Sequence, residues 1–227
     1  MAENAFEHHE NKRQGLLARI VIGVGLLMVF IMTLHPDGVT GDGSQNGTMR
    51  LVHGVLISLI IFNAFAVIEF SKQFGDAGGF KRLGRVFYAV GVFGLLLGTM
   101  VSGFVQTDLA ARSAAGAISA SSFETLNLFA SILNQNFIQF GIVAFGAAGL
   151  IWGGLQMFGD RCDLPFGIVG SLLSVYLVIG PLMGGYIDVS LMTHLTLAVV
   201  LWHSAFAIWF LRKLPLPAQS HKQSTMA

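Results

Sequence analysis

The chain has 227 residues, of which 54% are A, V, I, L, M, F, W, Y or C and only 11% are charged. Soluble domains carry about 25% charged residues, so this composition excludes an ordinary soluble enzyme, and it also excludes a disordered chain. The net charge of +1 offers no broad basic surface to a nucleic acid. A single cysteine, Cys162, excludes an intramolecular disulfide framework and a multi-cysteine metal site. We therefore expect a multi-pass helical protein of a bacterial inner membrane, surrounded by lipid.

Six apolar runs reach about the 20 residues that a helix needs to cross a bilayer. They are Leu16–Leu34, Leu51–Phe70, Val86–Val105, Asn134–Phe158, Leu164–Tyr186 and Leu191–Leu211. The first run is not a signal peptide, because acidic residues precede it and no small-residue cleavage site follows it. These runs predict an all-α fold with one transmembrane domain of six helices over residues 16–211. A cytoplasmic leader, residues 1–15, precedes the domain, and a disordered cytoplasmic tail, residues 212–227, follows it.

The basic residues predict the orientation of the bundle. Eleven of the 13 Lys and Arg residues lie on one side: ten in the two terminal segments and in the loops after the second and fourth runs, and Arg19 at the start of the first run. Only Arg50 and Arg112 lie on the other side. Cytoplasmic loops carry the excess of Lys and Arg in membrane proteins. Both termini are therefore expected in the cytoplasm, which agrees with an even number of spans.

The fourth helix is predicted to be unusually long. Ser121 and Glu124 have the spacing of a capping box, which marks the first turn of a helix. A helix from Ser122 to Phe158 would be about 37 residues and roughly 55 Å long, so that its first turns would stand outside the bilayer or lie along its surface. The alternative is two helices with a break near residues 134–136.

The second and sixth runs resemble each other after a shift of 141 residues. The shift places His53 on His194 and Ala64–Val67 on Ala205–Ile208. Membrane transporters are often built from internal repeats with a site at the repeat interface. This pattern predicts a duplicated helical hairpin made of spans one–two and five–six. Chance similarity is the alternative, because the first and fifth spans align poorly.

The few polar side chains of the spans lie at the predicted outer end of the bundle. A polar side chain inside a membrane suggests a functional site. They are His35, Arg50, His53, Gln106, Asp108, Asn134, Gln135, Gln139, Asp188 and His194. The pair His53 and His194 lies at similar depth on two parallel spans and is predicted to hold haem b or a transition metal. A further metal ligand is expected from His35 or Asp188. The alternative is that each histidine bonds to a neighbouring helix.

His203 lies nine residues beyond His194, roughly 13 Å deeper in the bundle. It is too far from His194 to share a small ligand with it. We expect a hydrogen bond from His203 to Ser174 or Asn63 within the bundle. The alternative is a proton relay from His194 to His203, because histidine titrates near neutral pH.

The sequence contains no H-E-x-x-H, G-x-S-x-G or phosphate-binding glycine motif, so no catalytic residue is predicted. Any enzymatic role would be that of a membrane oxidoreductase component. Three functions stay open: a redox or metal-handling protein, a small-solute, ion or proton transporter or channel, and an accessory or assembly subunit. The expected partners are the lipid bilayer and either membrane subunits or further copies of the chain, with no nucleic acid.

Overall fold

The computed structural model describes residues 2–36, 44–72, 78–158, 163–184, 187 and 189–213, and this part of the chain is helical throughout apart from short turns. The segments are α1 (Ala2–Thr33), α2 (Asn46–Ser71), α3 (Gly78–Met100), the π-helix η1 (Val101–Val105), α4 (Gln106–Ala114), α5 (Ala120–Phe158), α6 (Leu164–Gly184) and α7 (Val189–Lys213). Six helical spans are long and apolar enough to cross a membrane, with α3, η1 and α4 forming one of them. The predicted all-α bundle with six spans is confirmed.

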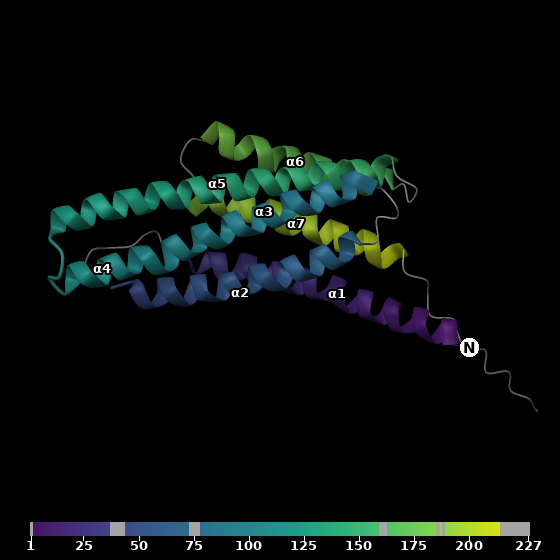
Figure 1. Ribbon diagram of the computed structural model, residues 1–227, viewed down its shortest axis with the longest axis horizontal. Coiled ribbons are helices and arrows are strands. Elements are labelled where there is room, and N and C mark those ends of the chain that lie inside the picture. The colour runs from purple at the N-terminus through teal and green to yellow at the C-terminus, as the bar shows by residue number, and fades with distance from the viewer. Residues whose placement is uncertain are drawn as a thin grey trace, which may run out of the picture.

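The helices run side by side along one long axis (Figure 1). α5 packs against α3 and α6, while α1 packs against α2 and α7. The beginning of α1 and the end of α7 lie at the same end of the bundle, at the right of Figure 1. The two described ends of the chain therefore lie on one side, as an even number of spans requires.

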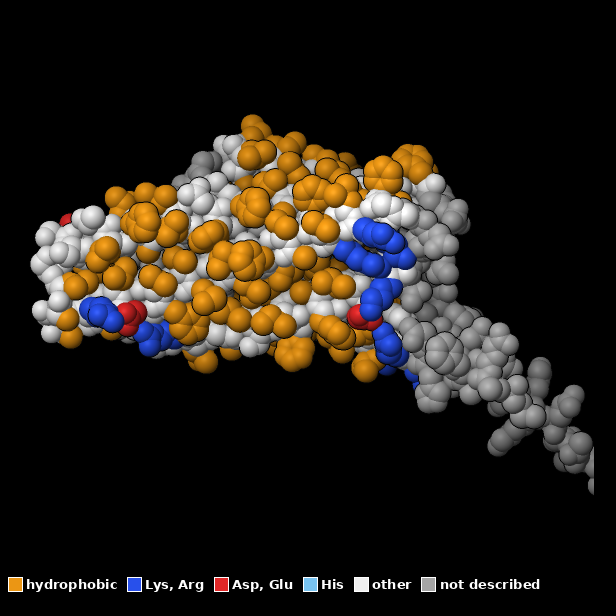
Figure 2. Space-filling model, in the orientation of Figure 1, with side chains coloured by type: hydrophobic (Ala, Val, Ile, Leu, Met, Phe, Trp, Pro, Cys, Tyr) orange, Lys and Arg blue, Asp and Glu red, His pale blue; other side chains and the backbone are white. Residues whose placement is uncertain are grey.

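The surface has an apolar middle and charged ends (Figure 2). Large apolar side chains are strongly exposed along the middle, including Phe62, Phe93 and Leu172 at 61% to 65%. Exposing such a large apolar surface to water is unfavourable, whereas the hydrocarbon of a lipid bilayer can cover it. We name the two ends by their residues: the histidine end holds His35, Arg50, His53 and Asp108, and the basic end holds Arg13, Glu69, Lys72 and Arg85.

The third span is longer than its apolar run and is not a regular α-helix. One turn of π-helix, η1, interrupts it at residues 101–105, and α4 then continues to Ala114. Hydropathy carries no signal for a π-turn, so the sequence did not indicate it. Gly116 follows α4 with a φ of 69° and donates its N–H to the carbonyl of Ser113 at 2.9 Å. This left-handed glycine ends the helix.

The long fourth span is confirmed as one continuous helix, α5, of 39 residues. The alternative, two helices with a break near residues 134–136, does not occur. The helix begins two residues earlier than predicted, because Ser119 and not Ser121 accepts the first backbone bond, from Ser122 N at 3.2 Å. A side-chain oxygen at this position satisfies a backbone N–H that the helix itself leaves unpaired.

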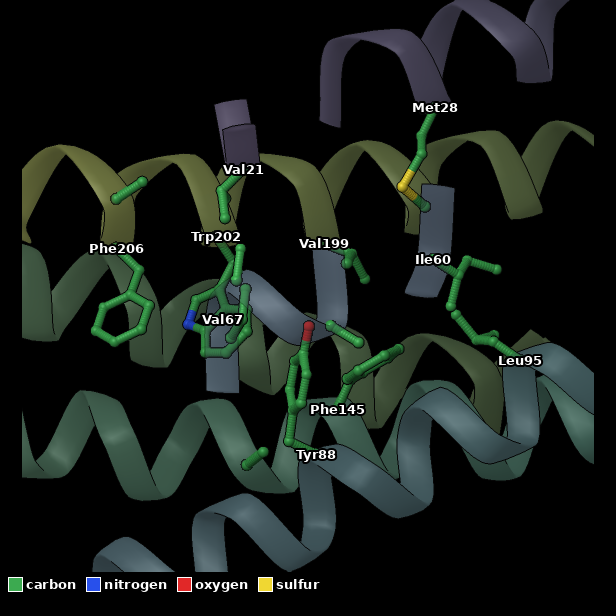
Figure 3. Packing of buried hydrophobic residues seen from close by; sticks show 14 of the residues in the cluster. Val21, Met28, Ile60, Val67, Tyr88, Leu95, Phe145, Val199, Trp202 and Phe206 are labelled. Atoms are coloured by element: carbon green, nitrogen blue, oxygen red, sulfur yellow. The ribbon is translucent and has the colours of Figure 1, made fainter. Parts of the chain in front are cut away.

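Glycines let α3 and α5 approach closely. A Cβ on Gly94 would lie 2.8 Å from Cα of Gly141, closer than two such atoms can come. Next to this contact, aromatic rings fill the core between α3, α5 and α7 (Figure 3). The rings of Trp152 and Trp202 stack at 5.7 Å between centroids, and Tyr88 lies against both. Close helix packing by small residues, expected in a membrane bundle, is present.

Candidate functional site

Two histidines meet at the histidine end of the bundle. His35 follows the end of α1, and His53 lies in the second turn of α2. Their Nε2 atoms are 3.3 Å apart, and their rings are tilted by 64° with centroids at 4.9 Å. His53 is buried, with 3% of its surface exposed, and His35 is partly buried. The contact therefore joins the segment after α1 to α2 through two imidazole rings.

Backbone carbonyls fix the tautomer of both rings. The Nδ1 atom of His53 lies 2.8 Å from the carbonyl oxygen of Met49, and the Nδ1 atom of His35 lies 2.6 Å from that of Pro36. A carbonyl oxygen only accepts hydrogen bonds, so each Nδ1 must carry a proton. In two neutral rings the Nε2 lone pairs would then face each other. Either a second proton is shared between the Nε2 atoms, or a cation binds both lone pairs.

The π-helix makes room for His53. Gly103, in the middle of η1, lies against this ring so closely that an added Cβ would be 2.2 Å from Cβ and 2.5 Å from Cγ of His53. The π-turn also widens the backbone by one residue, and such turns often occur at functional sites. Only a glycine permits this contact, so the third span is shaped around the buried histidine.

An arginine of α2 is tied to the start of α4, next to the histidines. Arg50 Nε donates to the hydroxyl of the buried Thr107 at 3.0 Å, and that hydroxyl donates to the carbonyl of Gly103 at 2.8 Å. Asp108 lies 3.9 Å from Arg50 and accepts from Arg112 Nε at 2.8 Å. These three charged side chains are about half exposed. Solvent screening makes such pairs weak, so we assign them to positioning α4 and to the local charge rather than to stability.

Amide side chains connect the outer part of α5 to its neighbours. Gln106 donates to Oδ1 of Asn127 at 3.1 Å. Gln135 bonds twice to the backbone of Ile187: its Nε2 donates to the carbonyl at 2.8 Å, and its Oε1 accepts from the N–H at 2.9 Å. The Oδ1 atom of Asn134 is buried and has no hydrogen-bond partner in the described part of the chain, and Gln139 is partly buried. Gln106 and Gln135 therefore tie α5 to neighbouring segments.

His194 does not join the two histidines. Its side chain is exposed, and its Nδ1 bonds to the carbonyl of Ser190 on its own helix at 2.8 Å. Among the described residues, no group of three His, Cys, Asp or Glu side chains is placed to hold a metal ion. Asp188, expected as a further ligand, lies outside the described residues. The structure thus pairs His53 with His35, and the burial of His53 and His194 differs in spite of their matching positions in the repeat.

His203 bonds to Asn63 in the middle of the bundle, as one of the two sequence expectations states. Their side-chain nitrogens are 2.9 Å apart, and both residues are buried. The other expected partner, Ser174, instead donates to the carbonyl of Gly170 on its own helix. Its hydroxyl lies where a Cβ on Gly149 would be, so it belongs to helix packing.

Glu69 is a buried acid at the basic end. Arg13 Nη2 lies 2.6 Å from Oε2, and Lys72 pairs with Oε1. Lys72 lies three residues further along α2, whereas Arg13 comes from α1. Side-chain hydrogen bonds and the charge of both cations stabilise the ionised form of this acid.

No protein-family model, curated protein or solved structure matches the chain. The function of the chain is therefore inferred from the geometry of the site.

Proposed function

We propose that this membrane protein binds a divalent transition-metal ion at its histidine end, through Nε2 of His35 and Nε2 of His53. The observation that carries this proposal is the apposition of two Nε2 atoms whose rings both have Nδ1 bonded to a backbone carbonyl. Metal-ligating histidines commonly donate their second N–H to such an oxygen, which fixes the tautomer and raises ligand basicity. Here both rings have that support before any ion binds.

The separation of the two nitrogens fits a tetrahedral ion. Zinc–nitrogen distances are about 2.0–2.1 Å, so two ligands at the tetrahedral angle lie about 3.3–3.4 Å apart. His35 and His53 lie at 3.3 Å. Two protein nitrogens leave the other coordination positions to water or to a bound substrate. Catalytic zinc sites also keep an open position, although they have three protein ligands.

Haem b fits this pair poorly. The two rings touch edge to face at 4.9 Å, with no space for a porphyrin plane between them. A haem held between His53 and His194 would need His35 to leave Nε2 of His53. A small ion needs neither change, because it needs only a position within reach of the two Nε2 atoms, which are 3.3 Å apart.

The basic residues support the orientation of this site. The described cations Arg13, Lys72, Lys81 and Arg85 lie around the opposite end of the bundle. By the positive-inside rule that end faces the cytoplasm, so the metal site would open to the outside. Uptake, sensing or storage of an extracytoplasmic metal ion are the roles consistent with this placement.

Titration of the purified protein with Co²⁺ tests the proposal, because a tetrahedral Co²⁺ site has strong visible absorption and its equivalence point counts the sites. We expect one site per chain, with affinity at least 100-fold weaker in His35→Ala and in His53→Ala. The matched control is His194→Ala, which removes the histidine of the alternative pair and should leave the titration unchanged. Absence of the cobalt band in the unmodified protein, or full binding by His35→Ala, would overturn the proposal.

A further inference from the structure

The buried ionisable side chains of the described residues are all associated with α2. Apart from Tyr88, they are His53, Glu69 and His203. The first two are part of α2, and the third is bonded to it through Asn63. An ionisable group inside a membrane is costly and marks function more often than stability. Of the other described spans, α7 buries His203 and α3 buries Tyr88, and the rest bury only uncharged polar groups. Two of the four buried ionisable side chains thus belong to α2, and a third is bonded to it.

The three groups lie at three depths. Along α2, Asn63 comes ten residues after His53, and Glu69 follows six residues later. With a rise of 1.5 Å per residue these steps are about 15 Å and 9 Å. Together they span about 24 Å, most of the hydrocarbon thickness of about 30 Å. A helix from another part of the bundle contributes at each depth: His35 from the end of α1, His203 from α7 and Arg13 from α1.

The middle pair has unsatisfied hydrogen-bonding atoms. Oδ1 of Asn63 and Nε2 of His203 are buried and have no partner among the described residues. If the amide donates to Nδ1 of the ring, Nε2 carries the ring proton, which leaves one donor and one acceptor unpaired. Turning the amide over exchanges these roles but again leaves one donor and one acceptor. Buried polar atoms in this state normally bind water.

The surroundings of the pair select a very small ligand. The His203 ring lies 4.7 Å from Trp202, 5.6 Å from Tyr88 and 6.1 Å from Phe145, measured between centroids. Figure 3 shows Tyr88, from α3, and Phe145, from α5, pointing into the same part of the bundle as Trp202. No second histidine, cysteine or acid among the described residues is placed to complete a metal site there. Water, which both donates and accepts, fits these requirements.

We propose that the Asn63–His203 pair is a hydrated proton-transfer site in the middle of the membrane, and that the protein conducts protons through it along α2. With the ring proton on Nδ1, water delivers a proton to Nε2 of His203 and the imidazolium releases the Nδ1 proton to water on the far side, which leaves the ring as its other tautomer. Rotation of the ring then restores the first arrangement before the next transfer. Apolar residues, among them Leu56 and Ile60, separate the middle pair from His53. Water must enter these gaps transiently, so conduction is expected to be slow, as in a transporter. This inference does not depend on a metal at His35 and His53.

Proton flux into sealed lipid vesicles tests the inference. The full-length protein is reconstituted, a potassium gradient with valinomycin supplies the driving voltage, and an enclosed pH dye reports proton entry. We expect flux above that of protein-free vesicles and at least a tenfold loss in His203→Gln, which keeps hydrogen bonding but does not titrate. Ser204→Ala is the matched control, next along α7, and should conduct as the unmodified protein does. Equal flux in vesicles with and without protein, or in His203→Gln and the unmodified protein, would overturn the inference.

A second measurement tests the water directly and needs no variant. X-ray irradiation splits bound water, and the radicals modify side chains within reach. Tyr88 and Trp202 should be labelled in spite of their burial, whereas Trp209, also buried and farther along α7 toward the basic end, should be labelled less. Labelling of Tyr88 and Trp202 no greater than that of Trp209 would show a dry centre and overturn the inference. Metal binding is a separate measurement, so failure here leaves the proposed metal site unaffected.

Discussion

Replacing Gly103 by alanine tests whether the π-turn is shaped around His53. The new Cβ would lie 2.2 Å from Cβ of His53, whereas carbon atoms in contact lie about 3.5–4.0 Å apart. The atoms in the way are Cβ and Cγ of His53, which are close to the backbone and cannot swing aside as the end of a long side chain could. Its ring is also held by the carbonyl of Met49 at 2.8 Å. The overlap of more than 1 Å can be relieved only by moving η1 away from α2.

The expected cost follows from that displacement. Overpacking a tightly packed site costs about 1–3 kcal/mol, and the rigid obstacle places Gly103→Ala at the upper end, about 3 kcal/mol. The shift also disturbs the approach of His53 to His35, so we expect Co²⁺ affinity to fall about tenfold or more, which corresponds to about 1.4 kcal/mol. The measurements are thermal unfolding in detergent and the cobalt titration.

Gly54→Ala is the matched control, because Gly54 is the next residue after His53 and faces the same span. Its added Cβ would meet only Cζ of Phe104, at an ordinary 4.0 Å. Alanine in a helix is favoured over glycine by about 0.5–1 kcal/mol, so this variant should be stabilised slightly. The two variants are thus predicted to change the free energy of unfolding in opposite directions. A Gly103→Ala protein as stable as Gly54→Ala, with unchanged cobalt affinity, would refute the reasoning.

Three further variants test the contacts that hold the helices. Glu69→Ala leaves two cations without their acid and should lower the free energy of unfolding by about 2 kcal/mol. Asp108→Ala, at an exposed pair, should lower it by less than about 1 kcal/mol. Equal losses in urea or thermal unfolding would contradict the idea that burial strengthens the Glu69 pairs. Ser119→Ala removes the cap of α5 and should lower the free energy of unfolding by about 1 kcal/mol, whereas Ser121→Ala should change it little. A larger loss in Ser121→Ala than in Ser119→Ala would favour the capping box predicted from the sequence. Gln135→Ala breaks both bonds to the backbone near Ile187 and should cost about 1–3 kcal/mol, with faster amide exchange at that residue; unchanged exchange would show that the bonds do not hold the segment.

The spans could be predicted because lipid imposes one pattern: about 20 apolar residues without charge. The length of α5 followed from the same rule and from a serine-rich cap. The turn η1 could not be predicted, since the extra residue of a π-turn leaves hydropathy unchanged. It affects the register of Gln106, Thr107 and Asp108, and therefore decides which partners they reach.

The site shows the same division. The sequence predicts a polar end of the bundle, because the position of a residue within an apolar run indicates its depth in the membrane. It paired His53 with His194 on the basis of a repeat, but which helices are neighbours depends on packing. The turn after α1 brings His35 onto His53, and no spacing rule connects these two positions. The bond between Asn63 and His203 was anticipated because a buried amide and imidazole at equal depth have few other partners.

The length of α5 has a practical consequence. At 39 residues and 1.5 Å per residue it measures about 58 Å, almost twice the hydrocarbon thickness of a bilayer. With α4 beside it, the helix forms a stiff hairpin closed by a short turn at Gly116, at the left of Figure 1. A small rigid domain inserted in that turn would stand clear of a detergent micelle. It would supply the asymmetric feature that particle alignment requires in electron microscopy, where a bundle of this size is otherwise nearly featureless.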